Sequence, residues 1–287
     1  MEKCFLNKRY LFCFLLTVFC LCVCTALVSQ IDSGVENNTS ISVESDEIAI
    51  NEGSLKDLPS IEESELLFAE FYKTGKIDTE PLFVGLEKLE QELTKVQNLK
   101  GKERNIEKEN QLLTLYLEYA KIVFTAYLFG SINQSFPKIH NMEKQIDVFL
   151  KRCKPNSSVC LKFADYLYAR LPENRKVVFK LPVLYRKVLL QDSKNNEAKV
   201  KLACWYTFSA QETTSNTNSF IEENEALIEE LSAVDRLNAY IVYSLYYMKK
   251  YNTKKGWKYL QKAEELFPSY ILTERLRANY KKGILSL

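Results

Sequence analysis

The sequence predicts an all-α protein built from consecutive antiparallel helical hairpins. Only 8 Gly and 7 Pro occur among the 287 residues, whereas compact β folds need many more such residues to form their turns. From Ile61 onward apolar residues recur at helical spacing, and short breaker sequences interrupt them. No segment sustains a period-two alternation, and no Asn-Gly or Asp-Gly hairpin turn occurs.

The first 28 residues have the layout of an export signal. An uncharged apolar run, residues 10–28, follows Lys3, Lys8 and Arg9. The run is also long enough to span a bilayer as a helix. Three outcomes stay open: cleavage after Ala26 to a soluble protein, retention as a signal anchor, or lipidation of a cysteine as in a lipoprotein. The candidate lipidation residues are Cys20, Cys22 and Cys24.

Residues 29–60 differ from both of their neighbours. They lack aromatic residues, are acidic on balance and are rich in Ser, Asn and Glu. Because such a segment cannot bury enough apolar surface to order itself, we predict a disordered acidic tether. It would join a membrane anchor in residues 1–28 to a helical domain in residues 61–287. We therefore expect an exported protein of the cell envelope or periplasm, attached to the membrane through its N-terminus.

The helical domain is expected to begin with a short helix around residues 61–75. A long apolar segment, residues 106–129, is predicted to form a central buried helix because most of its circumference is apolar. The remaining helices are expected at about 79–100, 136–152, 157–170, 180–191, 195–210, 219–231, 233–251, 253–266 and 269–283.

Residues 237–270 carry a pattern of large, small and aromatic side chains over 34 residues. The pattern comprises Tyr240, Tyr243, Ser244, Tyr247, Gly256, Leu260, Ala263 and Pro268. It resembles a tetratricopeptide repeat, a helix–turn–helix unit in which small residues let two helices approach closely. A weaker unit in residues 181–209 has a similar pattern. The resemblance implies a stack of hairpins, a tetratricopeptide-like α-solenoid.

The same resemblance implies a function in protein–protein interaction. In tetratricopeptide proteins the first helix of each repeat lines a concave groove that accepts a peptide or a partner helix. The corresponding positions are Val200, Cys204, Thr207, Phe208, Asn238, Ile241, Leu245, Met248 and Lys249. Most are apolar, so the expected occupant is another protein or an apolar ligand. The alternative is that the last helix, residues 269–283, packs against this face.

A second resemblance points to a role in transport. The sequence NQLLTLYLEYAKIVFTAYLF at residues 110–129, followed later by LYRKVLLQDS at 184–193, is similar to the T component of TRAP-type transporters. That resemblance implies an accessory subunit of a solute-uptake system, which binds an apolar small molecule or a periplasmic binding protein.

Catalytic and cofactor chemistry has little support in the sequence. His140 is the sole histidine and has no nucleophile motif near it, and the glycines form no phosphate-binding loop. With 39 basic and 37 acidic residues, the chain also lacks the basic balance of a nucleic-acid binder. We expect no enzyme, no cofactor and no nucleic-acid partner.

The three cysteines of the helical domain lack the spacing of a metal site. Cys153 and Cys160 flank the turn-forming sequence KPNSSV, and we predict a disulfide between them after export. Cys204 lies in an apolar helical segment and is expected to be a buried, inert thiol.

Overall fold

A computed structural model gives the structure of the protein and describes residues 58–78, 80–128, 136–208, 215–268 and 270–285. Within these ranges the regular elements are helices and no strand occurs, which confirms the predicted all-α class. The α-helices are α2 (Ile61–Thr74), α3 (Glu80–Asn98), α4 (Ile106–Leu128), α5 (Phe136–Arg152), α6 (Ser157–Ala169), α7 (Leu181–Gln191), α8 (Asn196–Tyr206), α9 (Ser215–Glu223), α10 (Ala233–Lys249), α11 (Thr253–Leu266) and α12 (Ile271–Lys281). Three short 3₁₀ helices are η3 (Gly101–Glu103), η4 (Arg175–Phe179) and η5 (Ala226–Glu230).

Polar residues at the helix starts explain several of the boundaries. Asn156, Asn195 and Asn252 precede α6, α8 and α11, and each side chain accepts a hydrogen bond from a backbone N–H of the first turn. Such caps satisfy donors that have no partner within the helix. Each of these asparagines therefore marks the end of a loop and the start of the next helix.

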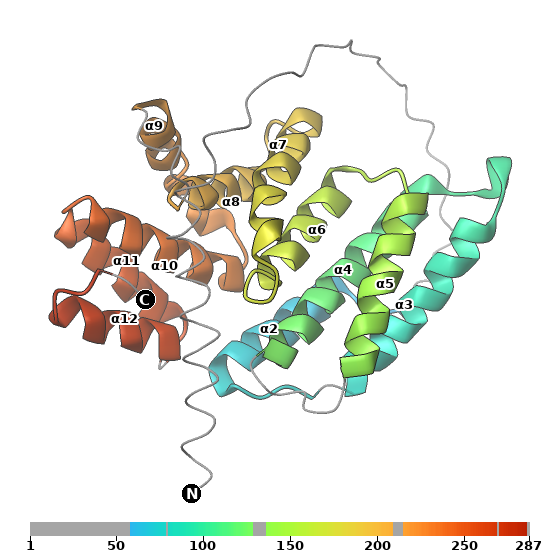
Figure 1. Cartoon of the computed structure of the whole chain (residues 1–287), viewed down its shortest axis with the longest axis horizontal. Helices are drawn as coiled ribbons and strands as arrows, with labels where there is room; N and C mark the ends of the chain where they lie inside the picture. Colours follow the sequence, from blue (N-terminus) through green and yellow to red (C-terminus); the bar gives the residue numbers. More distant parts are fainter. Residues whose placement is uncertain (1–57, 79, 129–135, 209–214, 269, 286–287) are drawn as a thin grey trace, which may run out of the picture.

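The helices pack mainly against their neighbours along the chain. Close packing joins α3 to α4, α4 to α6, α6 to α7, α7 to α8, and α10 to α11. Figure 1 shows the result, with α3 to α5 towards one end of the long axis and α10 to α12 at the other. As predicted, α4 is a central helix, because 16 of its 23 residues are buried.

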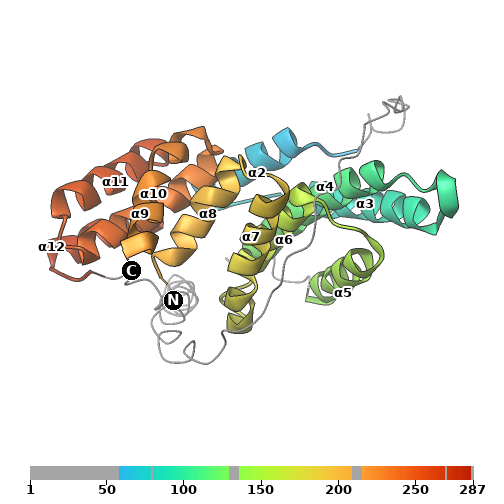
Figure 2. The same cartoon turned by 90° about the horizontal axis from the view of Figure 1, so that it is seen from above.

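Helix α2 departs from this sequential order. It packs against both α4 and α10, which are far apart in the sequence. Both views place α2 between α4 and the C-terminal helices (Figures 1 and 2). The helix therefore bridges the first and last parts of the stack.

The hairpin of α10 and α11 shows why two small residues were expected there. The hydroxyl of Ser244, fully buried on α10, donates to the carbonyl oxygen of Gly256 on α11 at 2.8 Å. A Cβ on Gly256 would lie 2.7 Å from Met248 Cγ, closer than real contacts allow. The two helices thus approach closely at the positions that the repeat pattern marked as small.

One predicted helix is divided in two. The segment 219–231 contains the end of α9 and the separate helix η5 instead of one continuous helix. At the break, the Asn224 side chain donates to the carbonyl of Phe220 at 2.7 Å, and Tyr243 donates to the carbonyl of Ile221 at 2.8 Å. Because these side chains satisfy carbonyls at the end of α9, the helix can stop there.

No helix among the described residues combines the length and the apolar character needed to cross a membrane. The apolar run at residues 10–28 and the cysteines predicted as lipidation sites lie outside the described residues, as does the predicted tether up to residue 57.

Candidate functional site

Seven charged side chains from four helices meet on one side of the stack. They are Glu118 and Lys121 of α4, Lys162 and Asp165 of α6, Glu197 and Lys201 of α8, and Asp235 of α10. We call the side of α4, α6, α8 and α10 that carries these residues the shared face. Charged groups seldom lie this deep in a protein unless they are paired.

Lys201 is at the centre of the cluster. Its Nζ lies 2.6 Å from Glu197 Oε1, 2.7 Å from Asp165 Oδ2 and 3.3 Å from Asp235 Oδ1. Burial opposes its charged form, but the three carboxylates raise the pKa of Lys201 well above its usual value. A single ammonium group therefore joins α6, α8 and α10.

Lys162 links the same cluster to α4. Its Nζ lies 3.3 Å from Glu197 Oε1 and 3.6 Å from Glu118 Oε2. Glu118 also pairs with Lys121 one turn along α4. Burial alone would raise the pKa of Glu118, yet the two lysines hold it below its usual value. The cluster thus extends across all four helices.

The cluster contains four carboxylates but only three lysines. Burial raises the pKa of Asp165 to about 6, although Lys201 and Lys162 lie beside it. Asp235 differs: burial opposes its charge, but Lys201, Lys121 and Lys162 hold its pKa below the usual value. Asp165 is therefore the carboxyl group that takes up a proton first as the pH falls towards 6.

Tyrosines and a thiol surround the charges. The ring of Tyr168, on α6, is 45% exposed. Desolvation raises the pKa of its hydroxyl to about 12, and the positive charge of Lys201 opposes this rise. Cys204 is half-buried and not fully buried as predicted, and desolvation raises the pKa of its thiol to about 12. The shared face thus presents an aromatic ring beside an ionic cluster.

Helix α2 lies on this face. The ring centroid of Phe68 is 5.1 Å from Lys121 Nζ, a cation–π contact. One turn further along α2, the Tyr72 ring centroid lies 5.1 Å from that of Tyr270 and 6.0 Å from that of Phe267. One helix of the chain therefore already occupies part of the shared face.

The predicted groove positions divide into two groups. Val200, Ile241, Leu245 and Met248 are all buried within the core, so a partner could reach them only if helices moved apart. Asn238 is half-buried and hydrogen bonds to Tyr72 of α2, which places it on the shared face. Phe208 is half-buried beneath Lys249, whose Nζ lies 5.7 Å from the ring centroid. Of these six positions, only Asn238 and Phe208 are thus partly accessible in this structure.

The predicted disulfide is absent, because Cys153, Cys160 and Cys204 are all free thiols. Cys153 donates to Asn110 Oδ1 on α4 at 3.7 Å. Cys160 is buried on α6, and Lys187 of α7 lowers the pKa of its thiol against the rise that burial causes. Each sulfur thus contacts a different helix, and this arrangement explains why the turn between the two cysteines leaves them unbonded.

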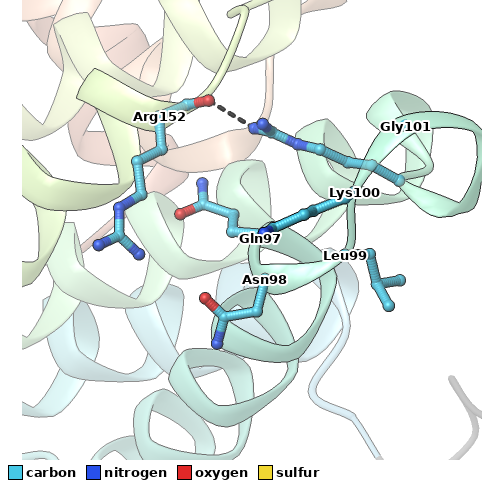
Figure 3. A pocket seen from close by; sticks show the side chains of 7 residues that line it. Gln97, Asn98, Leu99, Lys100, Gly101 and Arg152 are labelled. Carbon is cyan, nitrogen blue, oxygen red and sulfur yellow. Dashed lines mark hydrogen bonds between the residues drawn. The ribbon is translucent and has the colours of Figure 1, made fainter.

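A second candidate is an open hollow of about 490 Å³ where α3, α4 and α5 meet (Figure 3). Gln97, Lys100, Arg104 and Arg152 line it. The Arg104 guanidinium is held by the fully buried carboxylate of Glu109, at 2.8 and 3.0 Å, and donates to the Arg152 carbonyl. This arginine, in the loop before α4, therefore ties α4 to α5, which is a structural role.

Within the described residues, no group of His, Cys, Asp and Glu is arranged to hold a metal ion. His140 is exposed on α5, with Nδ1 3.8 Å from Glu143. The four carboxylates of the shared face each contact a lysine, which competes with any cation for the same oxygens.

The ionic cluster was not foreseen from the sequence, although a signal was present. Glu118 and Lys121 are the sole charged residues between Gln111 and Leu128, in a helix that is apolar on most sides. A charged pair in such a helix must face other polar groups. The partners on α6, α8 and α10 had no such signal, because their charges match those of solvated helix faces.

Searches against protein-family models, curated proteins and solved structures found no match for this chain.

Proposed function

We propose that the protein is a non-enzymatic helical-repeat scaffold that binds another polypeptide on its shared face. The observation that carries this proposal is that a helix, α2, is already seated on this face between α4 and α10. A surface that holds one amphipathic helix has the shape and chemistry to hold a helix of a partner. The four helices of the shared face, α4, α6, α8 and α10, are spread over most of the described sequence, as expected of stacked hairpins.

The location proposed for this scaffold is the cell envelope, with the N-terminal segment as its anchor. The support is the apolar run at residues 10–28 behind three basic residues, followed by the acidic segment up to residue 60. A tethered interaction module would present its shared face to partners outside the cytoplasm.

Site-specific photocrosslinking tests the scaffold function. A photoreactive phenylalanine replaces Tyr168, which is 45% exposed on the shared face, or Leu190, which is 87% exposed on α7. We expect one defined polypeptide to crosslink in cells from position 168 and not from position 190. The identified partner should then bind the purified protein, and a Lys201→Ala variant that stays folded should bind it at least tenfold more weakly. Equal crosslinking from both positions would place the functional surface elsewhere.

A second candidate is an accessory subunit of a TRAP-type uptake system that binds a small molecule. The exposed ring of Tyr168, beside the charge of Lys201, favours this alternative because an aromatic ring next to a charged group suits a small ligand that has an apolar part. Native mass spectrometry of the purified protein tests it. A bound small molecule that is lost from a Tyr168→Ala variant would favour this function over the scaffold.

A further inference from the structure

Helix α2 has the features of a self-contained helix. The Ser60 hydroxyl accepts from the Glu63 backbone N–H, and the Glu63 carboxylate accepts from the Ser60 backbone N–H. Gly75 ends the helix in the left-handed conformation, with φ of 66°. These are a capping box and a glycine C-cap, which satisfy the ends of a helix without help from other elements.

The seat of α2 buries little of the helix. Only Ser64, Phe68 and Phe71 of its 14 residues are buried, whereas 16 of 23 are buried in α4. Part of the surface beneath α2 is ionic, since Phe68 rests against Lys121. Helices of this length are marginally stable alone, so the contacts on the shared face hold α2 in place. Leu67, Ala69 and Tyr72 are partly buried against the core as well, so the helix is held along one side only.

The contacts of α2 define what the seat recognises. Phe68 packs over Lys121, and Tyr72, one turn further along, packs against Tyr270 and Phe267. Because Phe68 and Tyr72 are spaced by four residues, they lie along one side of the helix.

We propose that the seat of α2, formed by Lys121, Asn238, Phe267 and Tyr270, is the docking site for an amphipathic helix of a partner protein. The partner helix carries two aromatic residues four positions apart on one side, and it replaces α2 on binding. This inference rests on the proposed scaffold function and specifies its partner. In the absence of that partner, α2 covers the site.

A peptide of residues 58–76 serves as the probe, because it carries this pattern. Its fluorescently labelled form is titrated with the full chain and with a Phe68→Ala, Tyr72→Ala double variant, in which α2 is weakly seated. We expect the double variant to bind the peptide at least tenfold more tightly than the unaltered chain. Leu66→Ala is the matched control, because Leu66 is 71% exposed on the opposite side of α2, and it should bind as the unaltered chain does. A peptide with both aromatic residues changed to alanine should bind none of the chains.

A second variant covers the case in which the double substitution unfolds the protein. Ser60→Ala, Glu63→Ala removes the capping box from the exposed end of α2 and leaves the core untouched, and it should also tighten peptide binding. Equal affinity of the peptide for the unaltered chain and a folded variant, or binding to neither, overturns the inference. Such a result would make α2 a fixed part of the fold. The scaffold function is tested separately, and it fails only if crosslinking from position 168 shows no preference over position 190.

Discussion

The raised pKa of Asp165 predicts how the stability of the protein changes with pH. Burial raises its pKa to about 6, against an ordinary value near 4, while Lys162, Lys201, Glu197, Asp235 and Tyr185 surround it. Since the folded state binds this proton more tightly than the unfolded state, the stability that protonated Asp165 contributes is complete below pH 4. It is lost as the pH rises through 6.

An Asp165→Asn variant should therefore lose this part of the pH dependence. Between pH 5 and pH 7.5, we expect the free energy of unfolding of the unaltered protein to fall relative to that of the variant by roughly 1 kcal/mol. Urea unfolding at several pH values measures the difference. Asp147→Asn, at an exposed position on α5, is the control and should run parallel to the unaltered protein. A parallel pH profile for Asp165→Asn would mean that Asp165 is ionised throughout this range.

A substitution at Leu245 tests whether this residue lies in the core or in an open groove. It is 4% exposed on α10, so Leu245→Asp should bury an unpaired carboxylate and destabilise the protein by several kcal/mol. The same substitution at Leu190, which is 87% exposed, should change stability by less than about 0.5 kcal/mol. Thermal melts of the two variants give the comparison. An unchanged melting temperature for Leu245→Asp would restore the apolar groove that the sequence predicted.

These residues show where sequence reasoning is strong and where it is weak. The spacing of apolar residues identified Leu245 and Met248 as one side of a helix, but it could not tell a covered side from an open one. Charged residues such as Lys201 and Asp235 resemble solvated ones in the sequence. Only the packing of four helices brings these charged residues together, and that packing cannot be read from a local sequence pattern.

At the scale of elements, the α10–α11 hairpin depends on the absence of a side chain at Gly256. A Cβ there would lie 2.7 Å from Met248 Cγ and 3.2 Å from the Ser244 carbonyl oxygen. Gly256→Val should therefore force the two helices apart and destabilise the protein by about 1–3 kcal/mol. Lys258→Val, at an exposed site on the same helix, is expected to cost about 0.5 kcal/mol. Equal losses of stability would show that the close approach is unimportant.

Helix positions followed well from apolar periodicity and breakers, and α5 coincides with its predicted range of 136–152. The division of residues 219–231 between α9 and η5 was missed because it depends on Tyr243, a residue of another helix. The short range of α2 was expected, but its position across the stack was not. Its amphipathic pattern indicates a buried side without indicating which surface buries it.

At the scale of the whole molecule, packing between neighbouring helices explains most of the fold, and α2 supplies the contact that joins its two ends. Helix α2 packs on α4 and α10 at once. The ionic cluster below it joins the same helices by charge. The shared face is thus both the centre of the molecule and its proposed binding surface.

Hydrogen–deuterium exchange on the full chain tests most directly whether this face carries an exchangeable helix. If α2 leaves its seat while the stack stays folded, its amides should exchange at least ~100-fold faster than those of α4 and α10, a difference of about 3 kcal/mol in opening free energy. Adding the 58–76 peptide to the Phe68→Ala, Tyr72→Ala variant should slow exchange in α4 and α10. Exchange of α2 at the same rate as α4 and α10 would contradict the account, because α2 would then open only when the whole protein unfolds.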